Sequence, residues 1–151
     1  MLMSAATVNS IIKHRGKDAF PSSVVLEAAK FSKPGVLRVL EQHNFDLTVA
    51  DNQGCSILHL AARNDQLETV EYLFTVGFPV NATDKFGQTT LHEAVMYCNP
   101  KVVDVLLQNG AQVNAQDKSG DAPIHVLIKY PQEGFCYMKS SSSGAPKYLK
   151  Q

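Results

Sequence analysis

Residues 84–96 read Asp-Lys-Phe-Gly-Gln-Thr-Thr-Leu-His-Glu-Ala-Val-Met, in which Asp-x-x-Gly is followed four residues later by Leu-His. The same phrase opens 33 residues earlier at Asp51 and 33 residues later at Asp117, where Ile124 replaces the leucine. Three copies at one period indicate a stack of small similar units. Neighbouring units in such a stack bury their apolar faces on one another. They bind partners along a surface rather than in an enclosed pocket.

Each unit has the residue types of a turn followed by two helices. Asp-x-x-Gly is turn chemistry, because Asp accepts bonds from its own backbone and Gly tolerates a positive φ. Ser56 or Thr89 then caps a first helix, and a short turn leads to a second helix. In the unit that opens at Asp84 this second helix begins at Pro100. Gly77 and Gly110 end the second helix in a left-handed cap. The residues expected to be buried in the second helices are Val70, Leu73, Phe74, Val103, Leu106 and Leu107.

The repeated phrase carries a resemblance to a known family. Residues 56–61 read Ser-Ile-Leu-His-Leu-Ala, residues 89–94 read Thr-Thr-Leu-His-Glu-Ala, and residues 122–127 read Ala-Pro-Ile-His-Val-Leu. Two Gly-x-x-Val-Asn-Ala segments follow at 77–82 and 110–115. Together they resemble the ankyrin repeat, whose phrase is Thr-Pro-Leu-His-x-Ala at the same period.

The resemblance implies an all-α solenoid of about four helix-turn-helix repeats with projecting hairpin-like loops, of which the last repeat is incomplete. It covers about residues 18–130. In the first repeat Pro21 replaces the turn glycine, Leu26 replaces the histidine and Asn44 replaces the glycine at the helix end. Terminal repeats are expected to be atypical because one of their faces meets water. The expected repeat boundaries are 18–50, 51–83, 84–116 and a partial 117–131.

Both ends of the chain lie outside this domain. Residues 1–17 are expected to form a tail or a capping helix, since apolar residues recur there at helical spacing. Residues 132–151 are expected to be a Ser-rich tail without fixed structure. Two interpretations of the C-terminus stay open. Either the tail folds back and covers the open face of the last repeat with Phe135, Tyr137 and Met138, or the chain is a truncated product whose last repeat lacks its second helix.

The charges are balanced in total but segregated along the chain. Residues 41–117 hold three Lys or Arg against ten acids, a net charge of −7, and both flanking segments are basic. One interpretation is a solvated surface of uneven composition, and the other is an acidic face that steers a basic partner. An acidic repeat body argues against nucleic acid binding, because phosphates would be repelled. No apolar run approaches the roughly 20 residues that span a bilayer, so no membrane partner is expected.

The sequence does not predict an enzyme. It contains no phosphate-binding Gly-rich loop, no Gly-x-Ser-x-Gly and no His-Glu-x-x-His. His59, His92 and His125 recur once per unit at the same phase, which favours a structural role in tying units together. Histidines one repeat apart are also too distant to share one metal ion. We therefore expect no catalytic residue, no metal and no cofactor or small-molecule substrate.

A protein partner is expected at positions that the repeated phrase leaves free. The function expected is that of a monomeric adaptor, scaffold or inhibitor in the cytoplasm or nucleus. The alternative is a recognition or regulatory arm of a larger assembly, such as a ubiquitin ligase substrate receptor or a transcription-factor inhibitor. Phe86, Met96, Tyr97 and Tyr130 are expected to form an aromatic and apolar anchor cluster. The predicted partner-binding residues are Asn52, Gln53, Arg63, Lys85, Phe86, Gln88, Met96, Tyr97, Lys118, Ser119 and Tyr130.

The family resemblance also implies a modification. Ankyrin-like domains are targets of asparaginyl hydroxylation at the Asn of Val-Asn-Ala, with a leucine eight residues before it. Asn81 and Asn114 fit this pattern, and both have that leucine. Pro79 and Gln112 stand where an acidic residue is usual.

Overall fold

The computed structural model describes residues 4–31 and 33–129, and over these residues it is helical. Its only β-type pairings there are two isolated bridges, Ala50 with Ser56 and Thr83 with Thr89, each closing the base of a loop. The elements are α1 (Ala5–Arg15), the 3₁₀ turn η1 (Lys17–Ala19), α2 (Ser23–Phe31), α3 (Pro34–Gln42), α4 (Ile57–Arg63), α5 (Leu67–Thr75), α6 (Thr90–Met96), α7 (Pro100–Gln108) and α8 (Pro123–Lys129).

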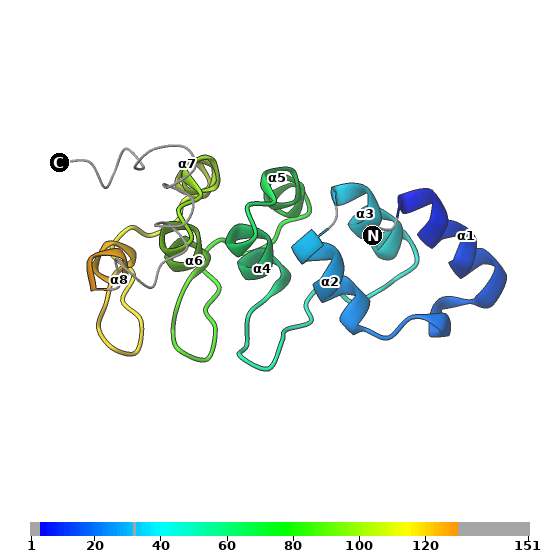
Figure 1. The fold of residues 1–151 in the computed structure, drawn as a ribbon, viewed down its shortest axis with the longest axis horizontal. Helices are drawn as coiled ribbons and strands as arrows, with labels where there is room; N and C mark the ends of the chain where they lie inside the picture. The colour runs from blue at the N-terminus through cyan, green and yellow to red at the C-terminus, as the bar shows by residue number, and fades with distance from the viewer. Residues whose placement is uncertain (1–3, 32, 130–151) are drawn as a thin grey trace.

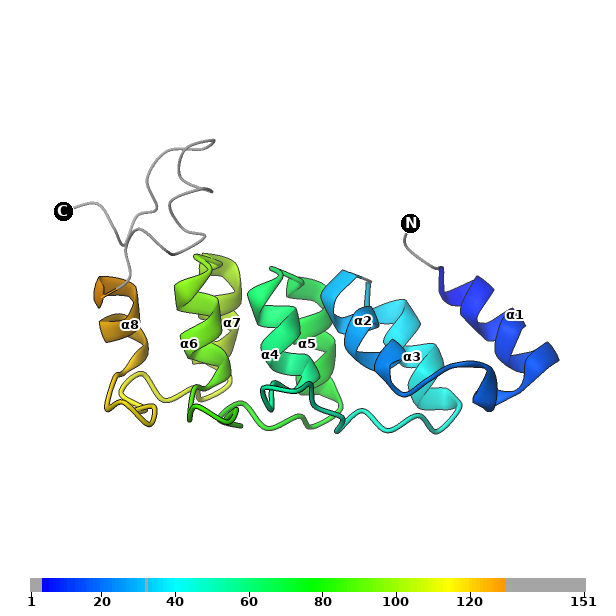
Figure 2. The ribbon, with the colours of Figure 1, turned by 60° about the horizontal axis from the view of Figure 1, so that its bottom comes forward.

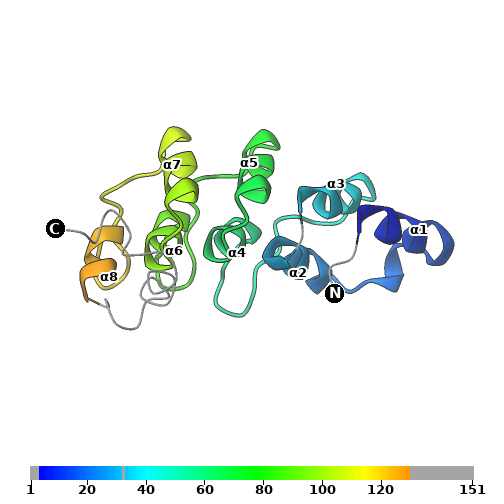
Figure 3. The ribbon, with the colours of Figure 1, turned by 45° about the horizontal axis from the view of Figure 1, so that its top comes forward.

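The helices form two parallel rows (Figures 1 and 3). We call α2, α4, α6 and α8 the inner row, and α3, α5 and α7 the outer row. Each inner helix packs against the next, and the outer helices do the same. Figure 2 shows the pairs standing side by side along the length of the molecule. Contacts between helices are therefore made mainly within a pair and with the adjacent pair, as a helical repeat solenoid requires.

The loops before α4, α6 and α8 project from the stack on the inner-row side (Figure 1). We call each of these loops a finger. In the middle finger one oxygen of Asp84, Oδ1, accepts bonds from the backbone N–H groups of Phe86 and Gln88, both at 2.9 Å. Gly87 then takes a φ of +75°. The Asp carboxylate thus closes its own turn, which is why Asp and Gly recur at this spacing.

The ends of the helices follow the sequence pattern. Gly77 and Gly110 have φ angles of +84° and +88° after α5 and α7, so both act as left-handed caps. Pro100 begins α7. The buried side chain of Asn99 donates from Nδ2 to the carbonyl of Ala62 at 2.6 Å and so bonds the end of α4 from the next repeat. Asn99 therefore precedes α7 and also bonds the end of α4 in the preceding repeat.

The predicted burial in the outer row is right for α5 and partly wrong for α7. Val70 and Leu73 are fully buried, and Phe74 is half-buried. In α7, Leu106 is buried together with Val102, while Leu107 is 40% exposed. Leu107 is the equivalent of Phe74 in the following repeat. The described part of the chain places no second helix after α7 to cover it.

The first repeat has lost its finger. Residues 17–19 form η1 where the other repeats have the Asp-x-x-Gly turn. Asn44 ends α3 with a φ of +61°, which is the left-handed role that glycine has in the later repeats. Residues 5–15, where the sequence left a tail or a capping helix open, form α1, which packs on α3 and buries Val8 and Ile12.

The last described element is the short helix α8. Ile124 and Ile128 are 49% and 67% exposed on it. Leu91 of α6, which is the equivalent of Ile124 one repeat earlier, is 3% exposed. Among the described residues no helix follows α8, so none of them covers this apolar face in the way that α8 covers α6. The place where a second helix of this repeat would stand, about residues 133–141, and the predicted tail from 132 onward lie outside the described residues.

Candidate partner-binding surface

The fingers are joined to one another through their backbones. The N–H of Lys85 donates to the carbonyl of Gln53 at 3.0 Å, and the N–H of Lys118 donates to the carbonyl of Phe86 at 2.9 Å. A Cβ atom at Gly54 or Gly87 would lie 3.0 Å from the next finger's backbone nitrogen. The repeated glycine therefore serves the turn and also lets consecutive fingers approach closely. The result is a continuous row of finger tips.

The repeated histidines join each inner helix to the next finger. In His92 the Nδ1 atom accepts from the backbone N–H of Thr89 at 3.0 Å, so Nε2 carries the proton and donates to the carbonyl of Asp121 at 2.9 Å. His59 makes the same two bonds to Ser56 and Gln88, at 3.3 and 3.0 Å. Both rings are fully buried.

His125 differs because it stands at the end of the described stack. Its Nδ1 atom accepts from the N–H of Ala122 at 3.1 Å, which is the equivalent bond within the repeat. The residue is exposed, and the described chain contains no following finger for its Nε2 atom to reach. The three histidines therefore have the same role within each repeat. Two of them also link repeats, as the sequence pattern predicted.

The tips of the fingers carry six of the predicted partner-binding residues. All are exposed, and Phe86 is the most prominent, since 54% of this large apolar side chain is accessible. Gln88 is half-buried instead, because its side-chain Nε2 donates to Oδ2 of Asp117 at 3.4 Å. We therefore assign Gln88 to the contact between repeats. The six tip residues, which we call the finger row, are Asn52, Gln53, Lys85, Phe86, Lys118 and Ser119.

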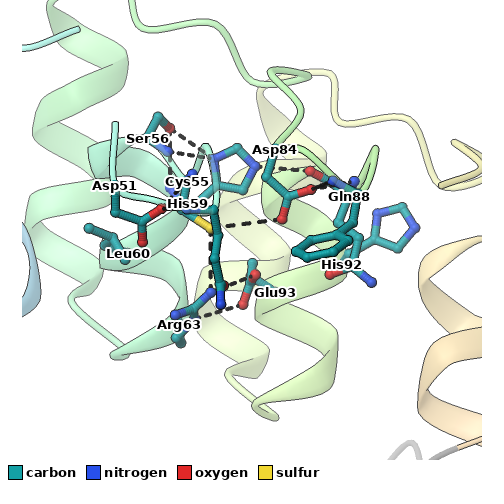
Figure 4. Close-up of polar contacts among 12 residues, drawn as sticks. Asp51, Cys55, Ser56, His59, Leu60, Arg63, Asp84, Gln88, His92 and Glu93 are labelled. Carbon is teal, nitrogen blue, oxygen red and sulfur yellow. Dashed lines mark hydrogen bonds and ion pairs between the residues drawn. The ribbon is translucent and has the colours of Figure 1, made fainter. Parts of the chain in front are cut away.

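Arg63, predicted as a contact residue, is largely committed to an ion pair inside the stack (Figure 4). Its Nε and Nη2 atoms each lie 3.0 Å from an oxygen of Glu93 on the next inner helix. The side chain of Glu93 is 4% exposed and that of Arg63 is 25% exposed. The pair fixes α4 against α6, because a bidentate guanidinium-carboxylate contact holds both groups in one geometry.

Glu93 was missed by the prediction from sequence. A signal for it was present, since the equivalent residues of the adjacent repeats are Leu60 and Val126. A carboxylate at a position that is otherwise apolar needs a buried partner. Arg63, on the facing helix, supplies that partner.

Cys55 lies beneath the same ion pair and is not available to a partner. It is fully buried, its Sγ atom is 3.8 Å from Oδ2 of Asp84, and Nη2 of Arg63 is 3.5 Å from the sulfur. Burial, and then the charge of Glu93, raise the pKa of the thiol to about 12. The donor atoms of Cys55, Asp84 and Glu93 all lie within 4.8 Å of one another, a grouping that could hold a metal ion. Arg63 already pairs with Glu93 and contacts the Cys55 sulfur in this grouping.

The predicted anchor cluster divides into two places. Phe86 lies in the finger before α6, whereas Tyr97 is the C-cap of the same helix, so the two rings lie at its opposite ends. The ring of Tyr97 covers Arg63, whose Cζ atom is 5.6 Å from the ring centroid, and burial raises the pKa of its phenol. Met96 is half-buried beside it. Tyr130 lies outside the described residues. Phe86 is therefore the exposed aromatic side chain of the fingers, and Tyr97 belongs to the inner helices.

The two asparagines expected to be hydroxylated have different surroundings. Asn81 donates from Nδ2 to the carbonyl of Gly110 at 3.4 Å, and its Oδ1 atom accepts from the N–H of Gln112 at 3.1 Å. The amide of Asn81 thus joins two repeats. Asn114 occupies the same place one repeat later and is exposed.

Paired helices in two rows, with backbone-linked fingers and histidines that bond across repeats, define a helical repeat protein. The family model for ankyrin repeats (3 copies) matches residues 2–84, 25–117 and 76–140. The chain belongs to the ankyrin-repeat family. Ankyrin repeats are generally protein-protein interaction modules, and the family is typically non-enzymatic. A search of curated proteins by sequence found no match. None of the helices in the described residues is long and apolar enough to cross a membrane.

Proposed function

We propose that this protein acts as a non-catalytic adaptor or inhibitor that holds another protein against its finger row and the inner helices α4, α6 and α8, which follow the fingers. The observation that carries the proposal is the exposure of Phe86. A large aromatic side chain that stays 54% exposed at the tip of a projecting turn has no role in the core. Buried aromatic anchors contribute most of the binding free energy at many protein interfaces.

The rigidity of the finger row supports the same function. The tips are fixed by the backbone bonds between fingers, and the turn of Phe86 is closed by the carboxylate of Asp84. A surface that is ordered before binding loses less conformational entropy when it binds. The finger row can therefore present Phe86 to a partner with little rearrangement.

The test compares Phe86→Ala with Phe31→Ala in an affinity capture followed by quantitative mass spectrometry. Phe31 is a matched control, because it is the same residue type at 53% exposure and lies on α2. We expect Phe86→Ala to lower the capture of a specific partner at least about tenfold, and Phe31→Ala to leave it unchanged. Thermal melting of both variants should match the wild type.

Two results would contradict the proposal. Equal loss of capture by both variants would mean that any exposed phenylalanine is merely adhesive. Full capture by Phe86→Ala would remove Phe86 from the interface. A variant that no longer melts cooperatively would be replaced by Phe86→Leu, which keeps an apolar side chain while removing the ring.

We also propose that Asn114 is the preferred site of asparaginyl hydroxylation. Both asparagines are exposed, and the proposal is supported by the bonds that hold the amide of Asn81 to the next repeat. Treatment of the protein with an asparaginyl hydroxylase should add one oxygen to the peptide containing Asn114 before the peptide containing Asn81. Modification of Asn81 first, or of neither residue, would remove the proposal.

A further inference from the structure

The finger row carries positive charge that the structure does not neutralise. Lys85 and Lys118 are exposed on consecutive fingers, and neither forms an ion pair with any described residue. Lys85 precedes Phe86 in the chain, and the backbone N–H of Lys118 on the next finger donates to the carbonyl of Phe86. Two cationic residues therefore stand next to Phe86, one on its own finger and one on the following finger.

The carboxylates nearest to these lysines are turned into their own loops. Oδ1 of Asp84 and Oδ1 of Asp117 each accept two backbone N–H bonds. Bonds from the N–H groups of Asp121 and Ser119 and from Gln88 outweigh the opposing effect of burial and lower the pKa of Asp117. The remaining oxygens, Oδ2 in both residues, face the preceding repeat. These acids stabilise the fingers and leave the lysine charges available.

The acids that make the repeat body negative lie elsewhere. Glu68 and Glu71 are exposed on α5, and Asp104 is exposed on α7, all in the outer row (Figure 1). On the inner row Glu93 is paired with Arg63, and Asp121 is paired with Lys129. Of the ten acids in residues 41–117, three lie in the fingers, where they close the turns, and the other seven lie on the rest of the stack. The expectation that an acidic face steers a basic partner therefore applies to the outer row and not to the finger row.

We propose that the finger row binds an acidic, extended segment of a protein partner, with an apolar side chain seated on Phe86 between two carboxylates that face Lys85 and Lys118. This inference rests on the proposed function and names the chemistry of its partner. Opposite charges at such a rim set the association rate and the register of the segment. Two cations are too few for a nucleic acid strand, which needs a longer run of Lys or Arg to neutralise its phosphates.

The test is fluorescence anisotropy with the full chain and defined probes. The first probe is a fluorescein-labelled peptide of sequence Glu-Asp-Glu-Leu-Asp-Glu-Gly, the second has lysine at each acidic position, and the third is a single-stranded oligouridylate of equal negative charge. We expect the acidic peptide to bind most tightly and to weaken as salt is raised. Lys85→Gln with Lys118→Gln should weaken it about tenfold, since two exposed ion pairs are lost.

The matched control is Glu68→Gln with Glu71→Gln, which changes the total charge by the same amount on the outer row. It should leave the affinity for the acidic peptide within about twofold, because those residues lie on the outer row rather than in the fingers and exposed charges at a distance are screened by salt. If this control raised the affinity for the acidic peptide as much as the double lysine variant lowers it, the total charge, and not the finger row, would govern binding.

Several results would overturn the inference. They are the absence of binding by the acidic peptide, tighter binding of the lysine peptide, tighter binding of the oligouridylate, or an unchanged affinity in the double lysine variant. A captured partner that depends on Phe86 but not on Lys85 and Lys118 would also overturn it, while leaving the proposed function intact. Loss of the Phe86 effect itself would instead contradict the proposed function.

Discussion

Both ring nitrogens of His92 are used, one within its own repeat and one on the next finger. His92→Ala should therefore remove two buried hydrogen bonds and leave a cavity, at a cost of about 2–4 kcal/mol in the free energy of unfolding. His125→Ala should cost less than about 1 kcal/mol, because His125 is exposed and keeps only the bond within its repeat. Urea denaturation of both variants measures the difference. Equal costs would mean that the bond across repeats contributes nothing.

The thiol of Cys55 should be protected from alkylation in the folded protein. It is fully buried, and its pKa of about 12 keeps it neutral at pH 8, whereas the thiolate is the reactive form. In an unfolded chain the thiol regains an ordinary pKa and its accessibility. Peptide-resolved labelling with iodoacetamide at pH 8 should therefore be slow in buffer and fast in concentrated urea. Rapid labelling of Cys55 in buffer would show that the contact between α4 and α6 opens readily.

At the scale of the elements, the fingers depend on two glycines in different ways. Gly87 and Gly120 share positive φ angles of +75° and +84°. A Cβ atom at Gly87 would also press on the backbone of Lys118 and Asp117, whereas one at Gly120 would meet nothing within 4 Å. Gly120→Ala should cost about 1–2 kcal/mol for the left-handed backbone alone, and Gly87→Ala should cost about 1 kcal/mol more. Urea denaturation of the two variants would reveal the difference, and equal costs would contradict the close approach of the fingers.

The period in the sequence was sufficient to predict the helices, because each unit repeats its own turn, cap and apolar spacing. It did not predict the exposure of Leu107, since the cover of that side chain depends on a repeat that follows rather than on its own. It also did not predict that Arg63, expected to contact a partner, forms an ion pair with Glu93. A contact between residues 30 apart depends on how one pair of helices is rotated on the next. The period specifies which helices are neighbours but not that rotation.

For the whole molecule, stability should fall toward the end of the stack. The helices α4 and α6 are covered on both sides by other inner helices, whereas α8 has only one described neighbour and leaves Ile128 67% exposed. In a repeat array each unit is stabilised mainly by its neighbours, so the end unit opens at the lowest free energy. Amide hydrogen exchange should be faster in α8 than in α4. Slower exchange in α8 would mean that its exposed face is covered in solution.

At their tips the fingers are linked through main-chain atoms. Because the bonds from Lys85 to Gln53 and from Lys118 to Phe86 use only N–H and C=O groups, they do not depend on which side chain stands at a tip. Substitutions at the six tip positions should thus be nearly neutral for folding while changing what the surface recognises. A lineage carrying this scaffold could exchange one binding preference for another through a few point changes. Its architecture would not need to be selected again each time.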